Sequence, residues 1–191
     1  MKKVILLTTV MLFGASLAFG QVGFLGTYAD PGGLECNVDD AVAGLLNVFI
    51  VSTHSIAAAV AFKAETPLCM STTGASFLAD TKPFPVTVGN SQTGVSVAYG
   101  ACLGPDATNV LIIAYFASGT TPLCCFFPIT GDPAQPGGEI IVTDCAFDDN
   151  IGVGVIHTVN GTPENCACTP PSPPVPVEES TWGKVKSLYV E

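Results

Sequence analysis

Eight cysteines constrain this chain more than any other feature of its sequence. Their number is even, and in an oxidising compartment structural thiols are normally paired, so the count predicts disulfide bonds. Zinc is the alternative, but a zinc site usually shows paired C-x₂₋₄-C ligands, and the chain offers only one vicinal pair and one C-x-C. The eight residues are Cys36, Cys69, Cys102, Cys124, Cys125, Cys145, Cys166 and Cys168.

The N-terminal segment predicts export. Residues 1–3 include two lysines, an apolar run follows over 4–13, and Ala18-Phe19-Gly20 places small residues where a signal peptidase cleaves. A transmembrane anchor is the alternative, but Gly14 and Ser16 interrupt the apolar stretch. We therefore expect a signal peptide over 1–20, export by the general secretory route, and no transmembrane span after cleavage. The product would be secreted, bound at the cell surface or periplasmic.

Short apolar runs broken by turn residues predict strands. Val95, Val97 and Tyr99 alternate with smaller residues, which is the period-two pattern of a half-buried strand. The run 110–116 is apolar throughout and predicts a central strand covered on both faces. Expected strands are 45–52, 57–64, 76–79, 84–88, 94–99, 109–116, 125–130, 139–143 and 152–159, with a loop over 39–45.

This pattern predicts an all-β fold, an immunoglobulin-like antiparallel β-sandwich stapled by disulfides, because no segment of the mature domain shows a convincing helical stripe. The sandwich would occupy 21–168. A Pro-rich linker over 169–177 would follow, extended over about 25 Å at about 3.1 Å per residue. Residues 178–191 would form a short amphipathic helix, marginal on its own, whose apolar face could dock on envelope sorting machinery. That face comprises Trp182, Val185, Leu188 and Tyr189.

The charge balance argues against a nucleic-acid partner. All six basic residues are lysines, and between Gln21 and Cys168 only Lys63 and Lys82 stand against thirteen acidic residues, a formal charge of −11 (2 − 13). Phosphate binding requires a Lys/Arg footprint that this domain lacks. An acidic surface also repels anionic lipids.

No catalytic or cofactor motif is evident, and we predict no cofactor. His54 and His157 stand alone and are interpreted as a turn residue and a sheet-surface residue. The string 89–94 is not a nucleophile elbow, because its second glycine comes one residue too late, and it is typical of a hairpin loop. One acidic loop is a weak calcium candidate, although it lacks the spacing of an EF-hand. Its oxygen ligands would be Asp144, Asp148, Asp149 and Asn150.

The disulfide connectivity is open, because eight cysteines allow 105 pairings. Adjacent cysteines in a strand point to opposite faces, so Cys124 and Cys125 should bind different partners. Our preferred set joins Cys102 with Cys124 and Cys145 with Cys166, each closing a short loop. The remaining bonds would then join Cys36 with Cys168 and Cys69 with Cys125.

Several short segments together resemble uncharacterised exported bacterial β-sandwich proteins that are rich in disulfides. They are Tyr28-Ala29-Asp30, Cys36-Asn37, the 89–94 loop, Tyr99-Gly100-Ala101-Cys102, Asp144-Cys145 and Cys166-x-Cys168. The tail Trp182-Gly183-Lys184-Val185-Lys186-Ser187-Leu188-Tyr189 resembles C-terminal W-G-x-x-K-x-L-Y segments of other secreted bacterial proteins. The resemblance implies location and architecture but no activity.

The leading functional hypothesis is a non-enzymatic secreted or cell-surface module that binds a protein or glycan ligand or serves a structural role, with a C-terminal sorting or docking tail. One alternative is an extracellular hydrolase acting on glycans through acidic residues on sandwich loops. However, a fold alone does not imply such an activity, and the only tryptophan lies in the tail. A calcium-stabilised adhesive domain is the other alternative.

Overall fold

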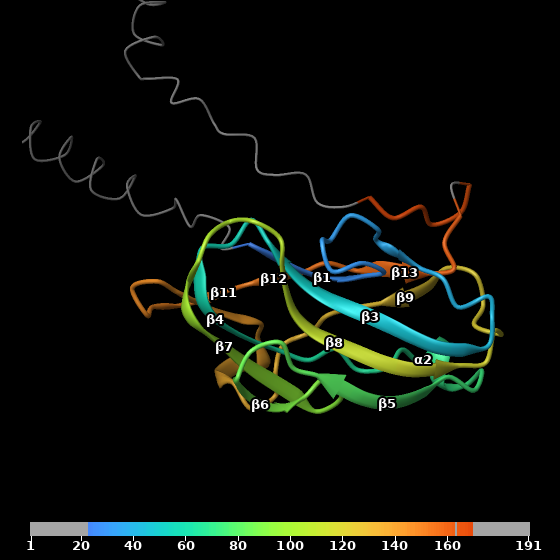
Figure 1. The fold of residues 1–191 in the computed structure, drawn as a ribbon, viewed down its shortest axis with the longest axis horizontal. Helices are drawn as coiled ribbons and strands as arrows, with labels where there is room; N and C mark the ends of the chain where they lie inside the picture. The colour runs from blue at the N-terminus through green and yellow to red at the C-terminus, as the bar shows by residue number, and fades with distance from the viewer. Residues whose placement is uncertain (1–22, 163, 170–191) are drawn as a thin grey trace, which may run out of the picture.

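The computed structural model describes residues 23–162 and 164–169, and these form a β-sandwich (Figure 1). The predicted all-β class is confirmed. The expected signal peptide over 1–20, nearly all of the linker and the C-terminal tail lie outside the described residues. Trp182, Val185, Leu188 and Tyr189 therefore stay a sequence prediction.

The first sheet has five strands in the order β12-β1-β3-β8-β5. Its centre is the long antiparallel pair of β3 and β8, which runs from Gly44 opposite Ala117 to Ser52 opposite Thr108. At one edge β12 pairs with β1 in parallel, a departure from the expected antiparallel arrangement. The bounds are β1 Phe24–Tyr28, β3 Gly44–Thr53, β5 Ser76–Thr81, β8 Thr108–Ala117 and β12 Val153–Gly154.

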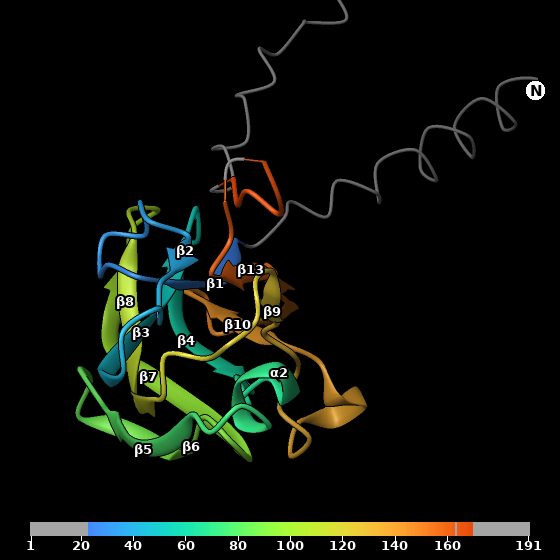
Figure 2. The same ribbon diagram turned by 90° about the vertical axis from the view of Figure 1, so that its right-hand side faces the viewer.

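The second sheet also has five strands, in the order β11-β10-β4-β7-β6, and a third sheet has three strands in the order β2-β13-β9. In Figure 2, β3 and β8 of the first sheet lie to the left of β4 and β10 of the second. The second-sheet bounds are β4 Ala57–Phe62, β6 Val86–Asn90, β7 Gly94–Leu103, β10 Ile141–Asp144 and β11 Asp149–Ile151. The remaining elements are β2 Asn37–Val38, α2 Leu68–Ser71, β9 Cys125–Phe127, η1 Pro136–Gly138 and β13 His157–Val159.

The core lies between the two large sheets and follows the alternation of side chains. Val95, Val97 and Tyr99 of β7 point inward, as do Leu111, Ile113 and Tyr115 of β8, and all belong to one buried cluster. Each fully buried large apolar side chain contributes roughly 1.5–3 kcal/mol. One expectation is wrong: the run 110–116 is not covered on both faces, because Phe116 is 52% exposed on the outer side of the sandwich.

The strands that the sequence missed are short or dominated by small residues. β1 contains Gly26, and β2 has only two residues. The expected strand 152–159 is divided into β12 and β13, and its glycines explain why. A Cβ on Gly154 would lie 2.3 Å from the carbonyl oxygen of Ile129, so this segment approaches neighbouring backbone too closely for a side chain.

All eight cysteines are paired, and two of the four expected bonds are confirmed, Cys36–Cys168 and Cys69–Cys125. The other two expectations are wrong: the bonds are Cys102–Cys145 and Cys124–Cys166. Ala57 of β4 pairs with Leu103 on one side and Asp144 on the other, so Cys102 and Cys145 flank the same end of that strand. The loop-length argument failed because the sheet brings together strands that are distant in sequence.

The vicinal cysteines bind different partners, as their adjacency predicts. Cys125 is buried and bonded to Cys69 of α2, whereas Cys124 has a left-handed backbone (φ 62°) and is bonded to Cys166. Each bond stabilises such a domain by about 2–4 kcal/mol. Four disulfides are typical of proteins that work in an oxidising compartment.

Candidate functional site

The two histidines lie apart and have different surroundings. His54 has φ 57° after β3, which agrees with the expected turn residue. His157 is not the expected sheet-surface residue, because it is 1% exposed and its ring meets Tyr28 edge-on with centroids 4.5 Å apart. Its Nδ1 lies 2.5 Å from the carbonyl oxygen of Thr27. Since a carbonyl only accepts, Nδ1 carries the proton, and burial lowers the pKa of this imidazole.

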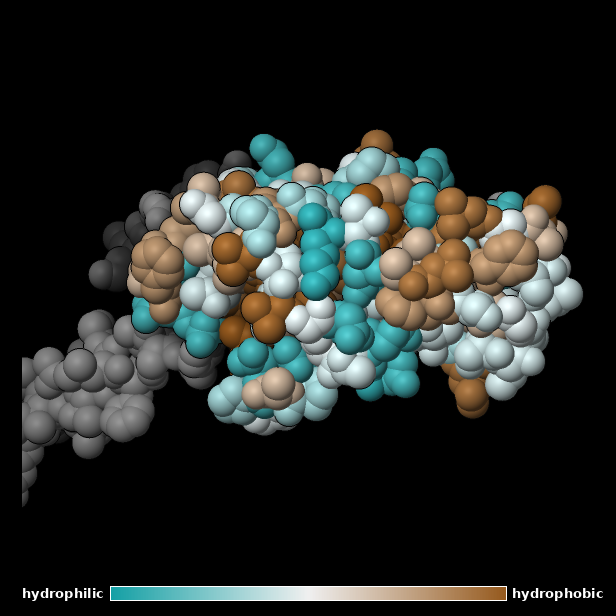
Figure 3. All heavy atoms as spheres, turned by 60° about the horizontal axis from the view of Figure 1, so that its bottom comes forward, coloured by the Kyte–Doolittle hydropathy of each residue, from teal (hydrophilic) through white to brown (hydrophobic). Residues whose placement is uncertain are grey.

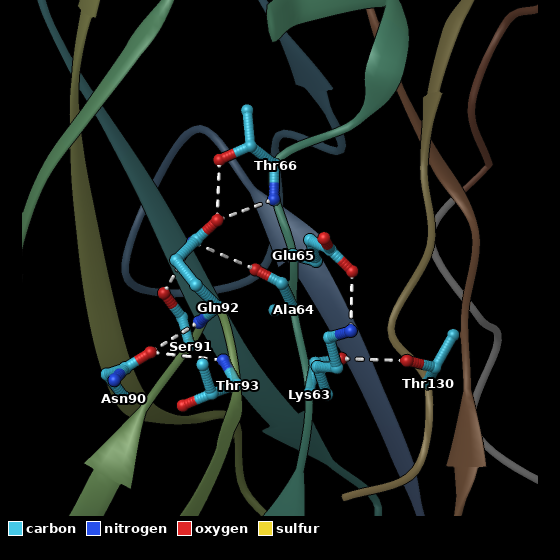
Figure 4. Close-up of polar contacts among 9 residues, drawn as sticks. All are labelled: Lys63, Ala64, Glu65, Thr66, Asn90, Ser91, Gln92, Thr93 and Thr130. Atoms are coloured by element: carbon cyan, nitrogen blue, oxygen red, sulfur yellow. Dashed lines mark hydrogen bonds and ion pairs between the residues drawn. The ribbon is translucent and has the colours of Figure 1, made fainter. Parts of the chain in front are cut away.

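The 89–94 string forms the tight turn between β6 and β7, and its polar groups hold the backbone (Figure 4). The Asn90 side chain accepts hydrogen bonds from the backbone N–H groups of Gln92 and Thr93. The Gln92 Oε1 in turn accepts from the backbone N–H of Thr66 at 2.9 Å and from its hydroxyl at 2.7 Å. The turn therefore fixes the position of the segment that leads into α2.

Ser91, the one hydroxyl in this turn that is fully buried, is also used structurally. Its backbone N–H and hydroxyl donate to the two carboxylate oxygens of Asp80 at 2.7 and 2.8 Å. A nucleophilic serine requires a base within hydrogen-bond reach and an exposed oxygen. Asp80 is within hydrogen-bond reach of the Ser91 hydroxyl, but Ser91 is fully buried, so its oxygen is not exposed to a substrate.

The calcium candidates lie in the hairpin between β10 and β11. The Asp144 Oδ1 accepts backbone hydrogen bonds from Ala146 at 2.8 Å and Asp148 at 3.0 Å, while Asn150 donates to Oδ2 at 3.3 Å. The hydrogen bonds from Asp148 and Ala146 lower the pKa of the Asp144 carboxyl. Asp149 accepts from the hydroxyl of Thr143 at 2.7 Å. These oxygens thus cap a turn, and calcium binding stays a prediction.

Across residues 23–162 and 164–169 no group of three or more His, Cys, Asp or Glu side chains is arranged to hold a metal ion. Within the same residues no helix is long and apolar enough to span a membrane.

A hollow of about 840 Å³ lies beside α2. Leu68 and Phe126 line it and are 77% and 57% exposed. Its charged group is already paired, since the Glu65 carboxylate lies 2.5 Å from the Lys63 ammonium (Figure 4). The hydroxyl of Thr72, also in the lining, donates to the Leu68 carbonyl at 2.7 Å. The hollow therefore presents apolar side chains and polar groups that already have partners.

A second concave surface lies on the outer face of the second sheet, and cross-strand register defines it. One row of neighbours runs Val88, Ser96, Ala61, Ile141, Ile151, and the next runs Val86, Ala98, Ala59, Thr143, Asp149. In both rows small side chains of β7 and β4 stand between larger ones of the flanking strands. We call this surface the trough.

The trough continues along the strands to an aromatic side chain. Its two hollows, about 220 and 370 Å³, share Ala59, Ala98 and Thr143 in their lining. The second ends at the Cys102–Cys145 bond and at Phe147, which is 79% exposed and has φ 67°. A bulky side chain in this left-handed region is an outlier that costs free energy, and such outliers concentrate at functional sites.

The charges around the trough are acidic and lie at one end. Asp149 lines it, and Asp144 and Asp148 belong to the same hairpin as Phe147. Of the two described lysines, Lys63 pairs with Glu65 and Lys82 donates to the Gly89 carbonyl, so neither lines the trough. The surface is apolar and uncharged at its centre with carboxylates at one end.

Exposed apolar side chains are not confined to the trough. In Figure 3 brown apolar groups form separate patches divided by teal hydrophilic ones. Val86 and Val88 are 57% and 70% exposed, and Leu45 and Phe116 on the opposite sheet are 70% and 52% exposed. Both outer faces of the sandwich therefore expose apolar surface.

Sequence reasoning missed the trough, although one signal was present. Ser96 and Ala98 alternate with the inward Val95 and Val97, so their outward direction was predictable. What the sequence could not reveal is that Ala59 and Ala61 of β4 lie beside them. The concavity arises from this register between segments that are distant in sequence.

Comparison with known proteins gives no family. No family model matches the chain, and no curated protein matches it. Among solved structures, a non-cellulosomal cohesin from the archaeon Archaeoglobus fulgidus matches with a TM-score of 0.45 at 9% identity, over 72% of this chain and 89% of that one.

Two further cohesins are similar. A cohesin module from a family 33 glycoside hydrolase of Clostridium perfringens has a TM-score of 0.45 at 7% identity, over 74% of this chain and 99% of that one. The seventh ScaB type I cohesin from Pseudobacteroides cellulosolvens has a TM-score of 0.40 at 12% identity, over 73% and 92%. Likenesses this distant transfer no partner to this chain.

Proposed function

We propose that this protein is a non-enzymatic, exported binding module that holds a segment of a partner protein in the trough. The observation that carries the proposal is the pair of cross-strand rows in which Ser96 and Ala98 of β7 and Ala59 and Ala61 of β4 stand between larger side chains of the flanking strands. A row of small side chains flanked by valine and isoleucine, as the first of these rows is, accepts a convex apolar ridge. Such a ridge is what one face of a helix or strand presents.

The composition of the trough favours a protein over a small polar ligand. Cores of protein interfaces are depleted in charge and enriched in aromatic side chains. The trough centre is uncharged, and Phe147 stands at its end with most of its ring in solvent. An exposed aromatic beside a concave surface is a typical binding hot spot.

The electrostatics specify the partner further. Asp149, Asp144 and Asp148 place negative charge beside Phe147, and the described domain carries a large negative net charge. The complementary partner is an amphipathic segment whose apolar row ends in lysine or arginine. Charge complementarity of this kind accelerates association and selects orientation more than it adds affinity.

The C-terminal segment 178–191 completes the proposal as a sorting or docking tail. It lies outside the described residues, so its support is the sequence alone: an apolar row of Trp182, Val185, Leu188 and Tyr189 behind a proline-rich spacer. In this arrangement the sandwich binds the partner while the tail fixes the protein at its destination. The module would thus be secreted or held at the cell surface.

The test uses the mature, oxidised protein and a phage-displayed library of random 16-residue peptides as the probe. Enriched peptides should combine apolar residues at helical or alternating spacing with lysine or arginine. The variant Ala98→Glu, which places a carboxylate in the centre of the trough, should weaken their binding at least tenfold, a loss of about 1.4 kcal/mol.

The opposite sheet supplies a matched control. Ala114 is also a half-buried alanine on the outer face of a central strand, so Ala114→Glu makes the same change on the other side of the molecule. Binding should survive in this variant. Equal losses in both variants, or a library that yields no binding peptide, would refute the trough as the binding surface.

A further inference from the structure

The outer face of the first sheet carries no charged residue along three cross-strand rows, in which apolar side chains lie beside a few uncharged polar ones. The first row is Leu45, Phe116, Ser76; the second is Asn47, Ala114, Ala79; the third is Phe49, Ile112, Thr81. Leu78, the bulged residue of β5, adds a further side chain that is 51% exposed. We call these three rows the uncharged face.

This face is unusual for the domain to which it belongs. The described residues carry thirteen carboxylates against two lysines, so most approaches of one copy to another bring like charges together. Like charges brought together at an interface cost several kcal/mol. A surface without charge is therefore where two identical acidic copies can meet at the lowest electrostatic cost.

The sheet edges, by contrast, are poorly suited to pairing with another strand. β5 is the outer strand of the first sheet, and its register shifts between Phe77 and Ala79, which marks a bulge. β6 is the outer strand of the second sheet and has only five residues, with Pro83 and Pro85 directly before it. Bulges, prolines and short strands protect edges from addition. Association should therefore proceed face to face.

We propose that the uncharged face is the surface through which two copies of this chain associate. The side chains of the face suit a two-fold axis that runs along the middle row. This row is small, with Ala114 and Ala79 beside Asn47, and the rows on either side carry large apolar residues. The axis would set the Leu45–Phe116 row of one copy against the Phe49–Ile112 row of the other. The partner of the trough would then be bound twice, once on each outer side of the dimer.

The size of the face sets the expected strength. The three rows span Leu45 to Phe49 on β3, about 17 Å at about 3.4 Å per residue, and three strands are about 14 Å wide. Two such faces would bury roughly 500 Å² in total, well below the roughly 1,200–2,000 Å² of stable specific interfaces. The dimer should therefore be weak and depend on high local concentration.

Sedimentation velocity of the mature, oxidised protein over a wide concentration range tests this proposal. A reversible monomer–dimer equilibrium should appear, and the dimer fraction should rise with added NaCl, because salt screens the repulsion between two acidic copies. Ala114→Glu should abolish the dimer, since two carboxylates would then lie near the axis. Asn47→Asp, a smaller change at an exposed position, should weaken it at least tenfold and serves if the first variant does not fold.

Two controls separate this proposal from the previous one. Ala98→Glu alters the trough and should leave the dimer intact. Asn165→Asp adds one charge at an exposed position outside both surfaces and should also leave the dimer intact. A protein that stays monomeric at every concentration, or a dimer that Ala98→Glu disrupts as strongly as Ala114→Glu, would overturn the uncharged face as the contact. The peptide-binding result for the trough would be unaffected by either outcome.

Discussion

Replacing Gly26 with alanine should destabilise the sandwich because two buried rings occupy the space that a side chain would need. A Cβ at this position would lie 2.7 Å from Cε1 of His157 and 2.8 Å from Cε2 of Tyr28. Both rings are essentially fully buried and meet edge-on, so neither can move away freely. Contacts this short do not occur in folded proteins, and at least one ring must shift.

The cost has two parts. Overpacking a core costs about 1–3 kcal/mol. Displacing His157 would also weaken its 2.5 Å hydrogen bond to the Thr27 carbonyl, and a typical net hydrogen bond contributes about 1 kcal/mol. Gly26→Ala should therefore lower the unfolding free energy by about 2–4 kcal/mol. At about 2–4 °C per kcal/mol for a domain of this size, Tm should fall by roughly 4–16 °C.

Thermal and guanidinium unfolding of the oxidised protein measure this effect, and Gly104 provides the control. A Cβ there would meet nothing within 4 Å, and its backbone φ lies outside the left-handed region. Gly104→Ala should be neutral or stabilise by up to about 1 kcal/mol through the unfolded chain. If Gly26→Ala lowered the free energy of unfolding no more than Gly104→Ala does, the rings of His157 and Tyr28 would not pack tightly against Gly26, and this prediction would be refuted.

Two further predictions concern pH and the tail. Burial lowers the pKa of His157 below its ordinary value of 6.5, so the unfolded chain binds a proton that the native protein excludes. The free energy of unfolding should therefore be highest above pH 6.5 and should fall as the pH drops below that value. Unfolding titrations at several pH values should show that His157→Gln removes this part of the pH dependence. Deleting 178–191 should leave the unfolding free energy unchanged but shift the protein from the cell fraction to the medium. Unchanged retention would exclude a role for the tail.

The sequence predicted the sandwich because its long strands alternate clearly. The inward residues of β7 and the apolar run of β8 were recognisable from period and composition. β1 was missed although its residues are buried, since a five-residue segment that contains a glycine shows little alternation. Its neighbour His157 was assigned to the surface for a similar reason: burial of a polar ring depends on Tyr28 and Thr27, which lie far away in sequence.

The candidate surfaces were harder to predict than the fold. Alanines on β4 are equally compatible with a packed core and with an open concave face, and only the register with β7 decides between them. The disulfides show the same limit. Cys102 and Cys145 are separated by 43 positions, and nothing local to either cysteine indicates that β4 lies between their strands.

The Cys36–Cys168 bond has a mechanical consequence. It joins residues 132 positions apart, near the first and last described residues of the chain. Tension applied between the two ends would pass from residue 23 to Cys36, across the disulfide, and out through Cys168. The strands between Cys36 and Cys168 lie outside this path, but β1 lies on it, so a pull on the ends first loads the pairing of β1 with β3 and β12. If β1 were drawn out, the strands that carry the trough would still be held within one covalent loop closed by the disulfide.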